Sequence, residues 1–189
     1  MEVSVKRQER SRKPIRIAIA GQLRSGKDTM AKYLVSQGFE HCKLSEGITD
    51  IASVFLEDIF GEKGKKREIY TTIGQSMRQL DPEVWLKYTW GNAPKTKNVV
   101  ISDVRQKNEE EFLRSQGFVI VGVESPMTMR YERAMEDGDF KESDMNHETE
   151  LSVQTISCDY YIQNEGTVMD LYDKTEALLD RIYVKCKMN

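Results

Sequence analysis

The chain has 189 residues, a charged fraction of 31% and a formal net charge of −3. This length predicts one domain with a substantial core, and the small net charge gives no overall attraction to nucleic acid or to acidic membranes. No apolar run reaches the roughly 18 residues that a membrane span needs, and the N-terminus lacks the apolar core of an export signal. We therefore expect a cytoplasmic protein without a membrane or nucleic-acid partner.

The first residues depart from this charge balance. The stretch from Lys6 to Arg16 is basic, and residues 1–14 are expected to form a flexible, solvated tail in front of a single domain at 15–189. A nucleic-acid-binding arm is the alternative for this tail.

The cysteines and histidines are few and scattered. Cys42, Cys158 and Cys186 have no C-x-x-C spacing, which fits a reducing compartment better than a disulfide framework. With only His41 and His147, the sequence offers no zinc cluster. Magnesium that accompanies a nucleotide is the one metal for which the residues argue.

Five short apolar segments alternate with helical patterns and predict strands. They cover residues 15–20, 39–44, 98–103, 118–123 and 159–163. Nearly continuous apolar runs fit strands that are buried on both faces of a parallel sheet, and apolar residues at helical spacing predict a last helix over 168–182. The alternation predicts an α/β fold with helices on both faces of the sheet, in which ligands collect at the carboxyl ends of the strands.

Between the first strand and the next helix, residues 21–29 read Gly-Gln-Leu-Arg-Ser-Gly-Lys-Asp-Thr. A Gly-x4-Gly-Lys sequence in this context is typical of a loop that binds nucleoside triphosphates. Gly21 and Gly26 let the backbone wrap around phosphate oxygens, the helix N-terminus adds positive potential, and Lys27 can reach the β- and γ-phosphates. An ordinary glycine turn is the alternative, and the motif alone does not separate kinases from switches, motors and other ATPases.

Asp28 departs from the usual motif, in which Ser or Thr follows the lysine and holds magnesium. The hydroxyl residue Thr29 comes one place later. The magnesium ligand therefore differs from the usual one.

A second acidic position follows the apolar run that ends at Ser102. Asp103 stands at the expected strand end, where an Asp can hold magnesium directly or through water. Arg105, two residues later, can add a bidentate clamp on a phosphate. The alternative is that Asp103 caps the helix that begins near Gln106.

Phosphoryl transfer needs positioned positive charge, and two regions supply arginines. Arg67 and Arg78 lie between the second and third strands. Around them are Lys65, Lys66, Gly74, Gln75, Asp81 and Trp85. Arg130 and Arg133 lie one helical turn apart after the fourth strand. A solvated helix face is the alternative for each arginine, and for Arg133 both interpretations stay open.

Four motifs occur in an order that resembles a known superfamily. They are Gly-x4-Gly-Lys-Asp-Thr, Ser102-Asp103-Val104-Arg105-Gln106, Arg130-x-x-Arg133 and Ile162-x-Asn164-x-Gly166-Thr167. The chain resembles the small P-loop kinases of the nucleoside monophosphate kinase superfamily, above all phage-type deoxynucleoside monophosphate kinases, with dephospho-coenzyme A kinase as a near relative. The helix from Arg67 to Gly74 with Asp81 and Trp85, and the lid-like His147-x-Thr149-Glu150, are also similar to the deoxynucleotide enzymes. The resemblance covers about 15–185.

The resemblance implies a three-layer P-loop NTPase fold with a five-stranded parallel sheet in the order 2-3-1-4-5. A substrate insertion would occupy about 45–95 and a lid about 127–155. The reaction would use ATP and Mg²⁺ and would move the γ-phosphoryl group to a (deoxy)nucleoside monophosphate, a step of nucleotide metabolism.

The resemblance also implies roles for individual residues. Lys27, Arg130 and Asp103 would be catalytic, Arg67, Arg78 and Arg105 would hold the acceptor phosphate, and Asp28 and Asp103 would hold magnesium. ATP would contact Gly21, Leu23, Arg24, Ser25, Gly26, Lys27, Asp28 and Thr29, with Asn164 and Gly166 near the adenine, largely through their backbone. Asp also follows the loop lysine in the deoxynucleotide enzymes and in the phosphomevalonate kinases of animals, so Asp28 is a known variation.

The acceptor is not defined by the sequence, because the chain is shorter than the phage enzymes and part of their substrate region is missing. A kinase for dephospho-coenzyme A or another small metabolite is an alternative, with Asp103 orienting the acceptor hydroxyl. A non-catalytic ATP-binding protein is a further one. The sequence leaves open whether the protein is a monomer or a homodimer, and whether His147 takes part or simply lies in a helix through 154.

Overall fold

The computed structural model describes residues 13–54, 67–136 and 152–188. The predicted tail therefore lies almost wholly outside the described residues, as do Lys65, Lys66 and the segment from His147 to Glu150. Within the described part, no helix combines the length and the apolar character that a bilayer span requires.

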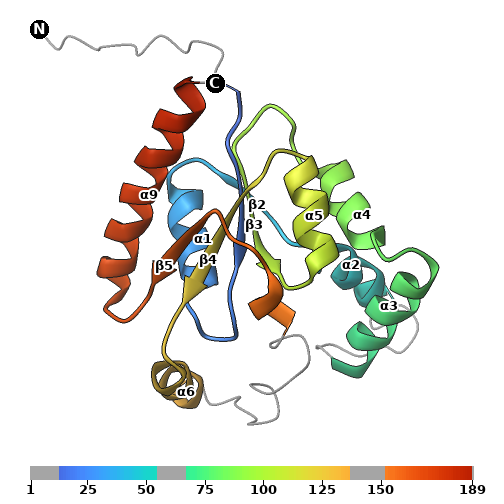
Figure 1. Cartoon of the computed structure of the whole chain (residues 1–189). Coiled ribbons are helices and arrows are strands. Elements are labelled where there is room, and N and C mark those ends of the chain that lie inside the picture. Colours follow the sequence, from blue (N-terminus) through green and yellow to red (C-terminus); the bar gives the residue numbers. More distant parts are fainter. Residues whose placement is uncertain (1–12, 55–66, 137–151, 189) are drawn as a thin grey trace, which may run out of the picture.

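A five-stranded parallel sheet forms the centre of the molecule (Figure 1). Its strands are β1 (Arg16–Ala20), β2 (Glu40–Cys42), β3 (Val99–Val104), β4 (Val119–Glu124) and β5 (Tyr160–Gln163). The spatial order is β2-β3-β1-β4-β5, with every neighbouring pair parallel. This confirms the predicted order and fold class.

The two strands nearest the second acidic position differ from their predicted bounds. β2 ends at Cys42, because the N–H groups of Leu44 and Ser45 bind the carboxylate of Asp103 rather than a neighbouring strand. β3 continues to Val104, so Asp103 lies inside the strand rather than after it. The register of β1 on β3 shifts between Ala18 and Ala20, opposite this point. Such irregularities bend a strand and redirect its side chains.

Helices α1 (Lys27–Ser36) and α9 (Val168–Met188) cover one face of the sheet. Met30 and Leu34 of α1 and Leu171 and Ile182 of α9 are fully or almost fully buried against the strands. α9 begins where the periodicity predicts and runs six residues further, to Met188. The buried stripe ends at Ile182, and the residues from Val184 to Cys186 in the extension are exposed.

Helices α4 (Val84–Asn92) and α5 (Lys107–Ser115) cover the other face. Leu86 of α4 and Leu113 of α5 are buried there with Ile101 and Ile120 of the strands. The sheet is therefore apolar on both sides, which explains its nearly continuous apolar strands.

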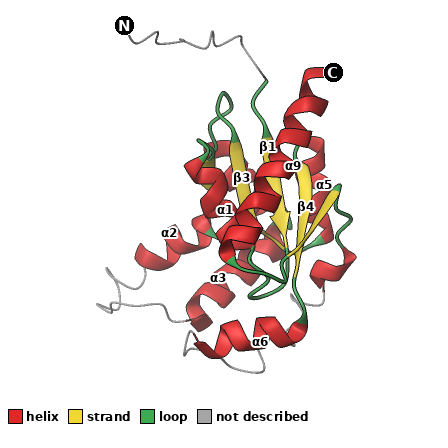
Figure 2. Cartoon of the chain, turned by 90° about the vertical axis from the view of Figure 1, so that its left-hand side faces the viewer, coloured by secondary structure: helices red, strands yellow, loops and turns green. Residues whose placement is uncertain are grey.

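Among the described elements, three helices stand between β2 and β3, and a further helix lies at the carboxyl edge of the sheet. α2 (Glu46–Val54), α3 (Arg67–Leu80) and α4 follow β2 in the chain, and α6 (Met127–Glu136) follows β4. Figure 2 shows α6 beneath the carboxyl ends of the strands and α2 and α3 beside them. Most of the predicted helix through 154 lies outside the described residues; of its described part, Ser152 is helical and Val153–Thr155 form a short 3-10 turn.

Candidate active site

The loop between β1 and α1 is closed so tightly that both motif glycines are required. A Cβ on Gly21 would lie 2.5 Å from Ser25 Oγ and 2.8 Å from the Val123 carbonyl oxygen. Gly26 has φ +103° and ends the loop as the N-cap of α1. A Cβ there would lie 2.2 Å from Asn164 Nδ2. Glycine is therefore needed both for the close approach and for the left-handed backbone.

Asn164 holds the loop from the end of β5. Its Nδ2 donates to the Ser25 carbonyl oxygen at 2.8 Å, and its own N–H donates to the Glu124 carbonyl oxygen at 2.7 Å. The side chain is buried, so it faces the loop rather than open solvent. Contact with the adenine, predicted to be largely through the backbone, stays a prediction for Asn164 and for the exposed Gly166.

Lys27 is the first residue of α1, directly after the loop. The residue is only 5% exposed, and its Nζ lies 3.7 Å from Asp28 Oδ2. A buried ammonium at a helix N-terminus adds to the positive potential of the helix end, so the position suits an anion. The predicted position of Lys27 in the phosphate loop is thus consistent with its geometry.

Asp28 contacts Ser102 of β3, a motif residue to which the sequence assigned no role. Ser102 Oγ lies 3.4 Å from Asp28 Oδ1 and 2.8 Å from His41 Nε2. Ser102 is fully buried, whereas the Asp28 side chain is 60% exposed. Burial lowers the pKa of His41, helped by the nearby positive charge of Lys43 and opposed by Asp103 and Asp28. Only the pairing of β2 with β3 brings His41 to Ser102, so no sequence spacing signals this contact.

Asp103 is directed toward the connection between β2 and α2. Oδ1 accepts the N–H of Leu44 at 2.8 Å and Oδ2 accepts the N–H of Ser45 at 3.0 Å. The alternative in which Asp103 caps the next helix is wrong, because Gln106 is the N-cap of α5 and forms a capping box with Glu109. A carboxylate has about four acceptor positions, so two hydrogen bonds leave capacity for a ligand.

Both arginines of α6 reach the phosphate loop. Nη1 of Arg130 lies 3.4 Å from the Leu23 carbonyl oxygen, and Nη1 of Arg133 donates to the Arg24 carbonyl oxygen at 3.1 Å. Arg133 also donates to the Asn164 carbonyl oxygen at 3.3 Å. A solvated helix face is therefore wrong for both residues, since Arg130 is buried and Arg133 is half-buried.

Two of the predicted acceptor arginines, Arg78 and Arg105, lie near the start of α5. Nη2 of Arg78 is 4.0 Å from Glu109 Oε1, and the N–H of Arg105 donates to Glu109 Oε2 at 2.7 Å. Glu109 was not recognised from the sequence, although the spacing Gln106-x-x-Glu109 is that of a capping box. Arg67 begins α3, and its side chain lies outside the described part.

Asp81 and Trp85 organise the connection between α3 and α4. Asp81 accepts the N–H of Glu83 at 2.9 Å and pairs with Lys87 Nζ at 2.8 Å, which lowers the pKa of this carboxyl. The indole Nε1 of Trp85 donates to the Gly74 carbonyl oxygen at 3.1 Å. Their described contacts hold the helices together.

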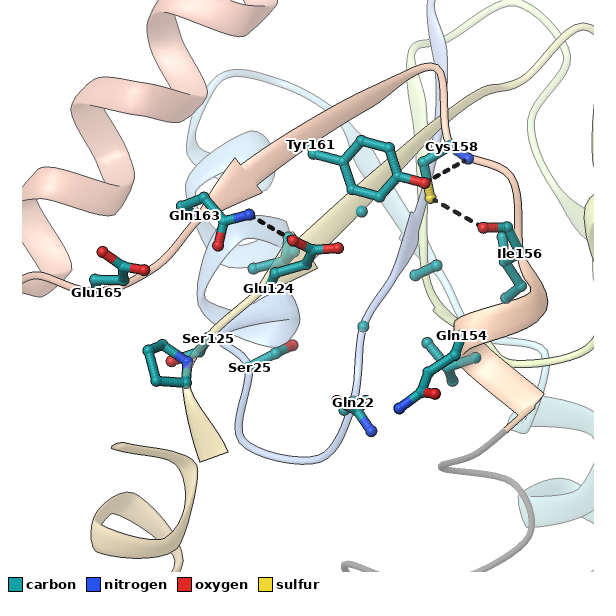
Figure 3. Close-up of a pocket in the computed structure, with 16 residues that line it drawn as sticks. Gln22, Ser25, Glu124, Ser125, Gln154, Ile156, Cys158, Tyr161, Gln163 and Glu165 are labelled. Carbon is teal, nitrogen blue, oxygen red and sulfur yellow. Dashed lines mark hydrogen bonds between the residues drawn. The ribbon is translucent and has the colours of Figure 1, made fainter. Parts of the chain in front are cut away.

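A cavity of about 500 Å³ lies beside the phosphate loop (Figure 3). It is bounded by residues of the loop and of β4 and β5, and by the turn at Val153–Thr155. Its lining includes the polar residues Gln22, Glu124, Gln154 and Glu165. None of the described residues that line the cavity is a lysine or arginine. Its polarity suits an uncharged ring or sugar better than a phosphate, because anions are bound by positive groups.

Two sequence comparisons find proteins similar to this chain. The model of the deoxynucleotide monophosphate kinase family matches residues 67–175. A UPF0200 protein of Sulfurisphaera tokodaii is 27% identical over 179 residues, which cover 88% of this chain and 96% of that protein.

Three solved kinases have the same fold at low sequence identity. A gluconokinase from Sinorhizobium meliloti 1021 has a TM-score of 0.61 at 16% identity, covering 94% of this chain and 98% of its own. Shikimate kinase from Acinetobacter baumannii, in complex with shikimate, has a TM-score of 0.59 at 17% identity, covering 91% and 94%. Dephospho-CoA kinase from Campylobacter jejuni has a TM-score of 0.50 at 14% identity, covering 89% and 97%. Identities this low establish a shared fold alone.

The family match is independent of the phosphate loop, because it begins at Arg67 and the loop ends before residue 30. It spans more than half of the chain and includes β3, α6 and the turn after β5, which contact or flank the loop in the structure. The loop, the sheet order and the matched region thus agree on one class of P-loop small-molecule kinases. The chain belongs to the deoxynucleotide monophosphate kinase family.

Proposed function

We propose that the protein transfers the γ-phosphoryl group of ATP to the phosphate of a (deoxy)nucleoside monophosphate, giving ADP and the corresponding diphosphate. The observation that carries this proposal is the convergence of Lys27, Arg130 and Arg133 on one glycine-closed loop. Transfer between two anionic oxygens needs such positioned positive charge, because the transition state spreads negative charge over the phosphoryl oxygens.

In the proposed reaction, the loop N–H groups and Lys27 bind the β- and γ-phosphates of the donor. Arg130 turns from the Leu23 carbonyl oxygen to the moving phosphoryl group, where its charge stabilises the transition state. The base and ribose of ATP extend toward β5, where the cavity beside Glu165 offers neutral and acidic groups. Asn164 keeps the loop closed through the Ser25 carbonyl.

The residues fit a magnesium ion held mainly by the nucleotide. Asp28 and Ser102 bring carboxylate and hydroxyl oxygens within 3.4 Å of each other, and Asp103 follows Ser102 in the chain. Oxygen ligands are those that Mg²⁺ prefers. The described residues contain no group of three or more His, Cys, Asp or Glu side chains around one point, so phosphate oxygens and water would complete the coordination. When bound, the ion would neutralise charge on the β- and γ-phosphates.

The acceptor is proposed to bind where α3 and α5 approach each other. Arg78 and Arg105 lie at this junction, and Arg67 begins the same helix as Arg78. We assign the helices within about 45–95 to acceptor binding and the region of about 127–155, which includes α6, to a lid. A phosphate dianion would be held by these guanidinium groups through bidentate hydrogen bonds.

The test is ADP formation from ATP and Mg²⁺ with a panel of all common nucleoside and deoxynucleoside monophosphates. We expect at least one to accelerate ADP formation well above the ATPase background, and Lys27→Ala to remove the acceleration. ADP formation with no monophosphate, but with dephospho-coenzyme A or another hydroxyl compound, would replace the proposal with the metabolite-kinase alternative. Asp103→Asn should then nearly abolish turnover. ATP binding without transfer to any acceptor would favour a non-catalytic protein.

A further inference from the structure

Glu109 is a buried carboxylate in the first turn of α5 that the proposed reaction has not used. It is 5% exposed, and its Oε2 accepts the N–H of Arg105 at 2.7 Å and the N–H of Gln106 at 3.0 Å. Its other oxygen lies 4.0 Å from Nη2 of Arg78 on α3. One carboxylate therefore contacts the backbone of one proposed acceptor arginine and the guanidinium group of another.

The turn that Glu109 stabilises also joins three parts of the molecule. The side chain of Asn108 donates to the Pro82 carbonyl oxygen between α3 and α4, at 3.3 Å. The Arg105 carbonyl oxygen accepts a hydrogen bond from Ser152 Oγ at 2.9 Å. The start of α5 is thus held to the insertion on one side and to the segment that precedes β5 on the other.

The distance between the Arg78 guanidinium and Glu109 is long enough for Arg78 to turn from Glu109 toward a bound phosphate. At 4.0 Å it is an ion pair rather than a hydrogen bond, and the Arg78 side chain is 31% exposed. Burial raises the pKa of Glu109, opposed by the hydrogen bonds from the Arg105 and Gln106 N–H groups and by the charge of Arg78. A buried carboxylate that needs a positive neighbour keeps that neighbour close.

We propose that Glu109 is the positioning residue of the acceptor-phosphate site: it fixes the backbone that carries Arg105 and keeps Arg78 aimed at the same point. The inference rests on the proposed function, which places the acceptor phosphate at these arginines. Loss of the Glu109 charge lets Arg78 move and costs acceptor affinity, while the phosphate loop is untouched. Glu109 itself does not contact the reacting atoms.

The next residue supplies a matched control. Glu110 is also buried, at 2% exposure, but it pairs with Lys107 at 2.7 Å and with Arg114 at 2.9 Å. It also accepts the N–H of Ser157 at 2.9 Å. The two glutamates are both buried and lie on the same helix, but the ion pairs of Glu110 are with Lys107 and Arg114 rather than with the proposed acceptor arginines.

The experiment compares Glu109→Gln with Glu110→Gln in steady-state assays that vary the monophosphate and ATP separately, with thermal unfolding measured in parallel. Glu109→Gln should raise the KM for the monophosphate about tenfold, as expected for loss of a charge-assisted contact. Its KM for ATP should change by less than about twofold. Glu110→Gln should lower the unfolding temperature without changing the KM for the monophosphate. In an Arg78→Gln background, Glu109→Gln should have a much smaller effect, because the two residues act together.

Several outcomes would overturn the inference. An unchanged monophosphate KM in folded Glu109→Gln would reduce Glu109 to a helix cap, and an equal rise in Glu110→Gln would point to general destabilisation. If Glu109→Gln does not fold, Glu109→Asp is used instead: its shorter side chain withdraws the carboxylate from Arg78, so the KM for the monophosphate should rise while the KM for ATP changes by less than about twofold. The wild-type protein separates the two proposals. A wild type that neither phosphorylates nor binds any monophosphate refutes both, whereas an active wild type with a silent Glu109→Gln refutes this inference alone.

Discussion

The two halves of the proposed site are built differently. The donor half comprises β1, the loop at 21–26, α1, α6 and the turn after β5, and its key side chains Lys27, Arg130 and Asn164 are only 5–6% exposed. The acceptor half comprises α2, α3, α4 and the start of α5, and its Arg78 side chain is 31% exposed. Buried polar groups have little freedom, whereas an ion pair with one partly exposed partner can rearrange.

Because the two halves differ in burial, we expect affinity for ATP and affinity for the acceptor to depend on different residues. The donor half is closed by contacts between segments far apart in the chain, such as Asn164 with Ser25 and Arg133 with Arg24. Changes there should affect ATP binding and the chemical step. Changes in the acceptor half should affect the KM for the monophosphate and leave ATP binding intact. The following variants test that separation, beginning with the largest expected effect.

Lys27→Ala should lower kcat at least about a thousandfold, because it removes a positive charge that is close to the transferred group. Rapid-quench or coupled measurement of ADP formation checks this. Lys32→Ala, an exposed lysine on the same helix, should retain wild-type kcat. Retained transfer in Lys27→Ala would show that the loop does not bind the donor as proposed.

Gly26→Ala should destabilise the fold by about 2–3 kcal/mol and weaken ATP binding at least tenfold. The reason is that an alanine would be held at a backbone φ of +103°, and its Cβ would lie 2.2 Å from Asn164 Nδ2. Gly91→Ala in α4 is the control, because nothing lies within 4 Å of its Cβ and alanine is the better helix former. Chemical denaturation and ATP titration measure both effects. Equal behaviour of the two variants would contradict the rigid donor half.

Asp28→Ala should raise the Mg²⁺ concentration needed for half-maximal activity about tenfold, the usual scale for loss of one group at a metal site. Binding of Mg²⁺–ADP, followed by calorimetry, should weaken in parallel. Asp180→Ala, at an exposed position of α9, serves as the control. A wild-type metal response in Asp28→Ala would show that Thr29 or Asp103 holds the ion instead.

Trp85→Phe should raise the KM for the monophosphate several-fold without changing ATP affinity. The substitution removes the N–H that binds the Gly74 carbonyl oxygen and costs about 1–2 kcal/mol in the packing of α3 on α4. Steady-state kinetics in which the monophosphate and ATP are varied in turn will measure the two KM values. A parallel loss of ATP affinity would mean that the two halves are coupled more strongly than their contacts indicate.

The thiol of Cys158 should react slowly with iodoacetamide near neutral pH. Burial raises the pKa of this thiol from its ordinary value of 9.0 to about 11, and only the thiolate is reactive. The exposed Cys186 should be labelled first, with Cys158 following as the pH approaches 11. Because the folded protein holds the Cys158 proton more tightly, stability from this group is complete below pH 9 and is lost as pH rises through 11. Peptide mapping of labelled protein tests the order.

The strands and the donor loop were predictable because their signals are contiguous. Nearly continuous apolar runs indicate buried strands, and Gly21, Gly26 and Lys27 lie within seven residues of one another. The resemblance to a known superfamily added the strand order, which the structure confirms. Strand ends were less predictable, since the end of β2 depends on the Asp103 carboxylate that arrives from β3.

The roles of Asp103, His41, Ser102 and Glu109 depended on the tertiary structure. The sequence predicts either a helix cap or a metal ligand at Asp103. Only the pairing of β2 with β3 brings its carboxylate to the N–H groups of Leu44 and Ser45. The contacts of Asp103, His41 and Ser102 join residues that are 58 to 74 positions apart, so they leave no periodicity or local spacing. A phosphate loop in a parallel sheet could be inferred from the residues alone, because backbone geometry and burial act locally. The packing of helices and strands decided which distant side chains complete the site.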